Sequence, residues 1–65
     1  MKFNEFDVVK LKNDDLEFGV KKSYLGTIVD VQKGTYCVEF LDDNNNTIEK
    51  ALDKYYSPDE LVKVN

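Results

Sequence analysis

The stretch GTIVDVQKGTYCVEFL, residues 26–41, decides the fold of this chain. Two runs rich in β-branched and aromatic residues flank Lys33-Gly34, which is the pattern of a β-hairpin with a two-residue turn. Glycine at the second turn position accepts the positive φ that a type I′ turn requires. Lys33 suits the first position less well, so a looser four-residue turn is the alternative.

The two-residue turn predicts the register of this hairpin. Side chains alternate along a strand, so three cross-strand pairs share one apolar face. These pairs are Val31 with Tyr36, Val29 with Val38, and Thr27 with Phe40. The other face pairs Asp30 with Cys37 and Ile28 with Glu39, which is typical of an antiparallel sheet with one solvated side. A slip of one residue would bury Glu39, so the pattern specifies the register.

The segments before the hairpin predict one strand and one long loop. Residues 5–11, EFDVVKL, form the first strand, with apolar residues on both faces and Phe3 packed nearby. Residues 12–25 have no sustained period and contain several turn formers, which indicates a loop. We expect four apolar side chains to pin this loop: Leu16, Phe18, Val20 and Leu25.

The segments after the hairpin predict two more strands. The turn 42–46, DDNNN, leads into residues 47–52, TIEKAL, which form a fourth strand or begin a helical turn. Pro58 and the two acids after it favour a one-turn 3-10 helix capped by Ser57. Residues 61–64 form the last strand. This order predicts an all-β fold in one domain, residues 1–65: a small SH3-like barrel of about five antiparallel strands with a 3-10 turn before the last strand.

Composition narrows the class of protein. Sixty-five residues support only a small core, which leaves little room for a deep active site. No apolar run is long enough to span a membrane, the first ten residues lack the apolar region of a signal peptide, and one cysteine cannot form an internal disulfide. We therefore expect a cytoplasmic protein. The net charge is −4 and every basic residue is lysine, which argues against nucleic acid as the main partner.

The chain resembles the DUF4926 family, small bacterial SH3-like domains of uncharacterised function. The resemblance lies in FDVVKL (6–11), LGTIVDV (25–31), YCVEFLD (36–42) and LVK (61–63). It implies the barrel fold, and because such domains look like neighbours of toxin-like proteins, it implies an immunity or antitoxin role. The Gly-x-Ile/Val pattern is also similar to KOW-type modules of ribosome and transcription proteins, although those are usually basic.

The sequence lacks the residues that several kinds of catalytic and metal site require. Without histidine, Ser-His-Asp and Cys-His nucleophile arrangements and histidine zinc sites cannot form. Cys37 is expected to be half-exposed beside Asp30, which would disfavour its thiolate. The spacing of Asp42, Asn44, Asn46 and Asp53 imitates a calcium loop, but it lacks the central glycine and the final glutamate, so a plain turn is expected. We predict no catalytic residue, no metal and no cofactor.

The residues expected to bind a partner are acids and tyrosines near the long loop and the 3-10 turn. Alternation places one of the two adjacent tyrosines in the core and the other outside, and tyrosine is enriched at protein interfaces. The candidate residues are Asp14, Asp15, Glu17, Tyr24, Tyr55 and Tyr56. The alternative is that these residues bind no partner: the acids are solvated surface charges and the tyrosines cover a small core.

Two functions remain from different classes. The first is a non-enzymatic module, a monomer or weak dimer, that inhibits a basic protein such as a toxin nuclease by stoichiometric binding. The alternative is a KOW-like accessory on a ribonucleoprotein or transcription complex, binding through a lysine patch. The lysines of that patch are Lys10, Lys12, Lys21, Lys22 and Lys33.

Overall fold

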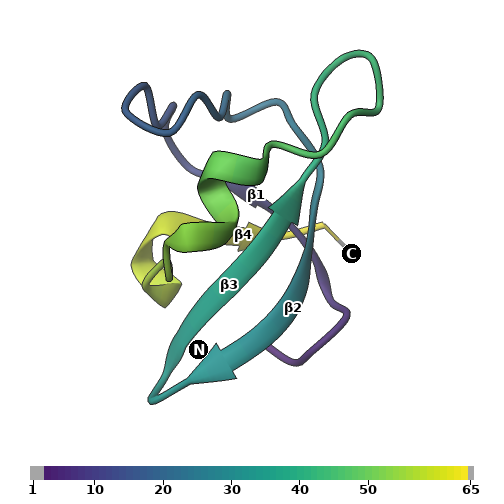
Figure 1. Cartoon of the computed structure of the whole chain (residues 1–65). Coiled ribbons are helices and arrows are strands. Elements are labelled where there is room, and N and C mark those ends of the chain that lie inside the picture. The colour runs from purple at the N-terminus through teal and green to yellow at the C-terminus, as the bar shows by residue number, and fades with distance from the viewer. Residues whose placement is uncertain (1–2, 65) are drawn as a thin grey trace.

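In the computed structural model, which describes residues 3–64, four strands form one antiparallel sheet in the order β3-β2-β1-β4 (Figure 1). The strands are β1 (Val8–Leu11), β2 (Gly26–Gln32), β3 (Thr35–Phe40) and β4 (Leu61–Lys63). Two 3-10 helices, η1 (Glu49–Asp53) and η2 (Pro58–Glu60), lie between β3 and β4. In the same part of the chain, no helix has the length and apolar composition needed to cross a bilayer.

The sheet is open, so the expected closed barrel of five strands is wrong. The last strand pairs with the first, but β3 and β4 remain at opposite edges of the sheet. Residues 49–53 form η1 instead of a strand, and this helical turn buries Ala51 against the core. Among residues 3–64, the free edge of β3 is met only by isolated bridges, between Leu41 and Thr47 and between Tyr36 and Tyr56.

The β2–β3 turn is as predicted. Lys33 and Gly34 have φ values of 51° and 81°, the two positive angles of a type I′ turn. Val31 pairs with Tyr36 and Asp30 pairs with Cys37, in the expected register. The turn chemistry therefore fixes the first part of the hairpin, even with lysine in the first position.

Farther from the turn, the predicted register is wrong because β2 contains a bulge. The pairing shifts between Ile28 and Asp30, so Val38 faces Ile28 instead of Val29. Ile28 also exchanges backbone hydrogen bonds with the segment before β1: its N–H donates to Asp7, at 3.0 Å, and its carbonyl accepts from Phe6, at 2.7 Å. The bulge lets Ile28 pair with β3 on one side and hydrogen-bond to the segment before β1 on the other. The side chain of Ile28 is completely buried, while Glu39 stays outside the core.

The core is built from residues of all four strands, of η1 and of the segments between them. Its largest fully buried side chains are Tyr56, Phe40, Ile28, Val9, Val20 and Val38. Gly26 is required beside them, because a Cβ atom there would lie 2.4 Å from a methyl group of Val38. Phe3 is buried, as expected, and packs edge-on against Tyr36 with 5.4 Å between ring centroids.

One face of β1 is exposed, contrary to the expectation that both are covered. Val9 and Leu11 point into the core, whereas Val8 is exposed and Phe6, which precedes the strand, is 73% exposed. Among the described residues, none packs closely enough over Phe6 and Val8 to bury them, so this face of β1 remains open to solvent.

Candidate functional site

The segment between β1 and β2 is folded back on itself as a short hairpin-like turn. Asp15 and Val20 exchange backbone hydrogen bonds, at 2.7 and 3.0 Å. Val20 is buried and Phe18 packs against the core, so two of the four expected pins hold the loop. The other two predictions are wrong: Leu16, within the Asp15–Val20 turn, is 84% exposed, and Leu25, directly before β2, is also exposed.

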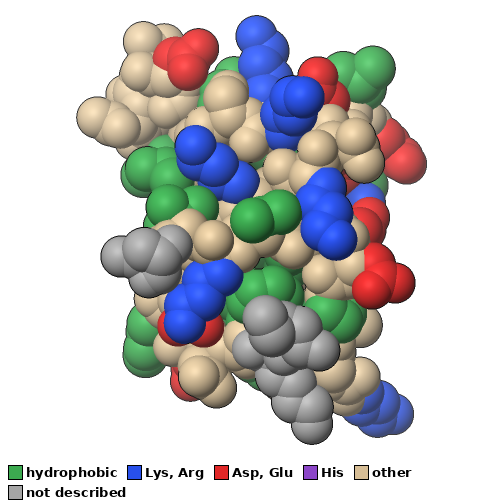
Figure 2. All heavy atoms as spheres, turned by 180° about the vertical axis from the view of Figure 1, so that it is seen from behind, with side chains coloured by type: hydrophobic (Ala, Val, Ile, Leu, Met, Phe, Trp, Pro, Cys, Tyr) green, Lys and Arg blue, Asp and Glu red, His purple; other side chains and the backbone are tan. Residues whose placement is uncertain are grey.

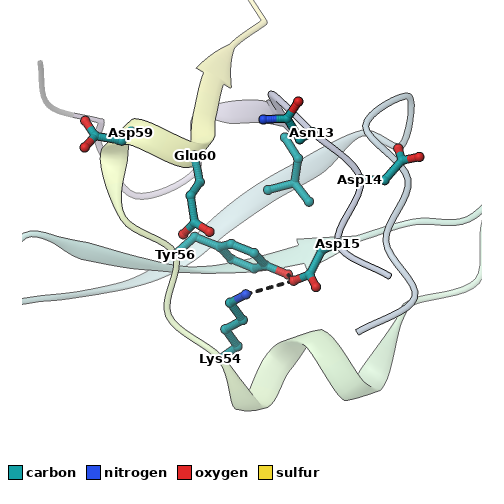
Figure 3. A pocket seen from close by; sticks show the side chains of 8 residues that line it. Asn13, Asp14, Asp15, Lys54, Tyr56, Asp59 and Glu60 are labelled. Atoms are coloured by element: carbon teal, nitrogen blue, oxygen red, sulfur yellow. Dashed lines mark hydrogen bonds and ion pairs between the residues drawn. The ribbon is translucent and has the colours of Figure 1, made fainter. Parts of the chain in front are cut away.

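A polar cluster fastens this loop to the segment between the two 3-10 helices. One carboxylate oxygen of Asp15 accepts from the ammonium of Lys54, at 2.9 Å, and from the hydroxyl of Tyr56, at 2.8 Å. Lys54 and Tyr56 come from the segment between η1 and η2, and Asp15 reaches them from the loop after β1 (Figure 3). The cluster therefore joins residues about forty positions apart in sequence.

Aromatic rings surround the ammonium of Lys54. It lies 4.5 Å from the ring centroid of Tyr56 and 5.0 Å from that of Phe18, both within the range of cation–π attraction. The side chains of Lys54 and Asp15 are only 27% and 14% exposed, so solvent screens their ion pair less than it would a surface pair. Lys54 thus has its charge compensated and its position fixed within the protein.

The cluster shifts two pKa values in opposite directions. Burial tends to raise the pKa of Asp15, but the hydrogen bonds from Lys54 and Tyr56 outweigh it and lower the pKa below its ordinary value. Burial, followed by the hydrogen bond to Asp15, raises the pKa of Tyr56. Asp15 therefore stays a carboxylate and Tyr56 stays a phenol at neutral pH.

A shallow groove of about 200 Å³ opens beside this cluster. Its lining residues are Leu11, Asn13, Asp14, Asp15, Lys54, Tyr56, Asp59 and Glu60. In Figure 3, Glu60 points toward the ring of Tyr56, whereas Asp14 and Asp59 stand at the two ends of the groove and point outward. The groove is thus lined by four carboxylates and by one ammonium, that of Lys54. The charge of that ammonium is already compensated by Asp15.

Backbone hydrogen bonds hold two of the groove's carboxylates in place. Glu60 accepts from the backbone N–H of Ser57, at 2.9 Å, at the start of η2. Asp14 accepts from the backbone N–H of Lys22, at 2.8 Å, across the loop. Both carboxylates still face solvent, so they remain able to contact a ligand.

Tyr55 lies away from this groove. It is 41% exposed while Tyr56 is fully buried, which is the predicted alternation of one tyrosine inside and one outside. Its hydroxyl donates to Asp30 of β2, and this hydrogen bond raises the pKa of Tyr55 to about 12. The same bond lowers the pKa of Asp30.

The structure brings three of the six predicted partner-binding residues to the groove: Asp14, Asp15 and Tyr56. Tyr24 packs partly against the core and lines a different hollow, and Glu17 is exposed at the loop turn. Sequence reasoning missed Lys54 and Glu60. The signals were present: Lys54 directly precedes the tyrosine pair, and Glu60 follows Ser57 at the spacing of a capping box.

Cys37 lies opposite Asp30, as predicted, but it is buried and not half-exposed. Its sulfur lies 3.5 Å from the carbonyl oxygen of Leu52, in the segment that covers it. Burial, followed by the charges of Asp30 and Asp53, raises the pKa of the thiol. Cys37 is therefore a poor nucleophile at neutral pH.

The calcium-like spacing after β3 forms a plain turn. One carboxylate oxygen of Asp42 accepts from the backbone N–H groups of Asn44 and Asn46, at 2.8 and 2.9 Å. Asn45 takes the left-handed conformation, with φ 65°, that asparagine tolerates. Within residues 3–64, no three histidine, cysteine or acidic side chains are grouped closely enough to hold a metal ion.

The face seen from behind Figure 1 carries several lysine side chains. Figure 2 shows lysine side chains over the middle of this face and acidic side chains at its margins. Lys10 of β1 pairs with the exposed Val62 of β4. Lys12 and Lys63 line a hollow beside Val62 together with Phe3 and Leu61. Asp59 lines both this hollow and the acidic groove, so the two adjoin at η2.

One comparison with known proteins identifies a family. The family described as "Domain of unknown function (DUF4926)" matches residues 5–51, which include β1, β2, β3 and the start of η1. No curated protein and no solved structure matches the chain. The chain belongs to the DUF4926 family, as its sequence resemblance predicts.

Proposed function

We propose that this DUF4926 protein is a non-enzymatic binding module that inhibits a basic partner protein by stoichiometric binding, in the manner of an immunity protein or antitoxin. The charge of the groove is the observation that supports this most. Asp14, Asp59 and Glu60 present carboxylates to solvent, while the single ammonium is already paired with Asp15. A lysine or arginine side chain of a partner would find opposite charge there and no free competing cation within the groove.

The protonation states favour binding over catalysis. A general base needs a pKa near the working pH, but the pKa of Asp15 is lowered further. The pKa values of Tyr56 and Cys37 are raised, so neither side chain ionises readily at neutral pH. The polar cluster next to the groove is therefore suited to holding the loop in place, and the exposed acids at the groove ends are suited to contact.

The net charge of −4 supports the same class of partner. Charge complementarity accelerates the encounter of two proteins and disfavours partners of the same sign. A small inhibitor must occupy its target before the target acts, so fast association has direct value. Because salt screens such attraction, the rate of association should fall as ionic strength rises.

The test is retention of a basic protein from a lysate of the source cells by the tagged protein, at low and moderate salt, with identification by mass spectrometry. The variant Asp14→Lys/Asp59→Lys reverses the charge at both ends of the groove and leaves the polar cluster of Asp15, Lys54 and Tyr56 unchanged. The control Asp43→Lys/Glu49→Lys makes the same change in net charge at exposed positions outside the groove. We expect one stoichiometric basic protein with the wild type and the control, and its loss with the groove variant.

Activity of the retained protein decides whether binding is inhibition. We expect one equivalent of the purified module to abolish that activity. Equal retention by the groove variant and the wild type would place the contact elsewhere. Full activity of the partner in the saturated complex would reject the inhibitor proposal.

The lysine side chains on the face shown in Figure 2 support a second candidate, a KOW-like accessory of a ribonucleoprotein or transcription complex. Lys10 and Lys12 lie on or beside β1, Lys21 and Lys22 lie in the loop, and Lys33 lies in the β2–β3 turn. A gel-shift experiment with total RNA at low salt tests this candidate. Retarded migration that disappears in Lys10→Glu/Lys12→Glu would favour it, and an unshifted RNA would remove it.

A further inference from the structure

The loop after β1 makes its backbone hydrogen bonds within itself. In residues 13–24, which we call the strap, Asp15 and Val20 exchange hydrogen bonds and the N–H of Tyr24 donates to Lys21, at 3.0 Å. Among the described residues, no backbone-to-backbone hydrogen bond joins the strap to another part of the chain. The strap is therefore a self-contained unit of backbone structure, as compact surface loops often are.

Both ends of the strap are fixed to the body of the protein. Just before it, the N–H of Lys12 donates to the carbonyl of Glu60, at 2.9 Å. Just after it, the carbonyl of Leu25 accepts from the N–H of Leu41, also at 2.9 Å. The strap can therefore lift away between these two fixed points without breaking a hydrogen bond of the sheet.

Few contacts hold the interior of the strap against the body. One oxygen of Asp15 accepts from Lys54 and Tyr56, and within residues 3–64 these are the only hydrogen bonds from the strap to the rest of the protein (Figure 3). Val20 is the only strap residue that is buried, while Phe18 packs partly against the core. The closed position thus depends on one carboxylate and a small apolar contact.

The acidic groove exists only while the strap is closed. Three of its lining residues, Asn13, Asp14 and Asp15, belong to the strap, and they supply two of its four carboxylates. If the strap lifts, those two carboxylates leave and the ammonium of Lys54 loses its partner. The groove would then keep only the two acids of η2 beside a free ammonium, so its negative charge would be much smaller.

We infer that the strap is a lid that opens and closes as one unit, and that the polar cluster of Asp15, Lys54 and Tyr56 is its latch. The closed lid forms the acidic groove and the open lid dismantles it. A cation bound in the groove would favour the closed state, because a ligand shifts an equilibrium toward the state that it binds better. The lid is a property of the free protein, so this inference goes beyond the proposed function and does not require it.

The test is amide hydrogen exchange of the free protein under native conditions, followed by NMR. The reporters are the amides of Val20 and Tyr24 in the strap and of Ile28 in β2, each of which donates a backbone hydrogen bond. We expect less protection at the two strap amides than at Ile28, because opening the lid requires less free energy than unfolding the sheet. Asp15→Asn weakens the latch and should lower the protection of the strap amides about 30-fold.

The variant Gly34→Ala separates the lid from the sheet. Gly34 has φ 81° in the β2–β3 turn, where alanine is strained, so the protection of Ile28 should fall about tenfold. Val20 and Tyr24 should keep their protection, since the lid opens without unfolding the sheet. An equal fall at all three amides would overturn the lid, because the strap would then open only with the whole protein. Strap amides unaffected by Asp15→Asn would overturn the latch. Neither result depends on a partner, so the proposed function is judged separately.

Discussion

Replacing Asp15 tests the polar cluster that positions the groove. Asp15→Asn keeps the size of the side chain and one acceptor oxygen, but it removes the negative charge opposite Lys54. A hydrogen bond between charged groups contributes about 1.5–3 kcal/mol, and the low exposure of this pair places the loss near ~2 kcal/mol. A domain of 65 residues has a total stability of only roughly 3–10 kcal/mol, so the loss is large.

The assay is equilibrium unfolding in urea, followed by far-UV circular dichroism. With a slope of about 1 kcal/mol per molar urea, the midpoint should fall by about 2 M. The thermal midpoint should fall by ~10 °C. Asp14→Asn is the matched control, because Asp14 is exposed and accepts one hydrogen bond, from the backbone N–H of Lys22, so its loss should stay below about 1 kcal/mol.

The pH dependence of this difference has a definite sign. The pKa of Asp15 is lower in the folded state than its ordinary value of 3.8. Its contribution to stability is therefore complete above that value and is lost as the pH falls through the folded-state pKa. Wild type and Asp15→Asn should converge in strong acid. Equal losses for Asp14→Asn and Asp15→Asn at pH 7, or a gap that persists in strong acid, would refute the reasoning.

Three further predictions concern the sheet. Gly26→Ala should cost about 1–3 kcal/mol in thermal unfolding, because its Cβ would lie 2.4 Å from Val38, and an unchanged midpoint would contradict this packing. Cys37 should react with a thiol reagent at neutral pH much more slowly in the native protein than in urea, since burial raises its pKa; equal rates would contradict its burial. In Asp30→Asn, the pKa of Tyr55, followed by NMR, should fall from about 12 toward its ordinary value of 10.0, and no change would contradict their hydrogen bond.

The sequence predicts local geometry better than the closure of the sheet. The β2–β3 turn follows from Lys33-Gly34, because a two-residue hairpin leaves few alternatives. The bulge near Ile28 could not be predicted, since it depends on hydrogen bonds with the segment around Phe6, more than twenty residues away. The fold of residues 49–53 was ambiguous by composition, and the burial of Ala51 against the core resolves it as a helix.

The candidate site was predictable only in part. Asp14, Asp15 and Tyr56 could be selected because acids and tyrosines are common at interfaces and the loop was expected near the 3-10 turn. The pairing of Asp15 with Lys54 depends on how the loop folds over the core, which no local pattern encodes. Composition alone could not distinguish the structural role of Asp15 from the solvent-facing position of Asp14.

The most direct measurement is an NMR titration of the ¹⁵N-labelled protein with the purified basic protein that it retains from the source cells. The account predicts that amide shifts cluster around Asp14, Asp59 and Glu60 and weaken as salt rises. The same titration with Asp14→Lys/Asp59→Lys should leave these amides unchanged. Shifts confined to Lys10 and Val62 on the outer side of the sheet, or binding unaffected by the charge reversal, would contradict the acidic groove as the binding site.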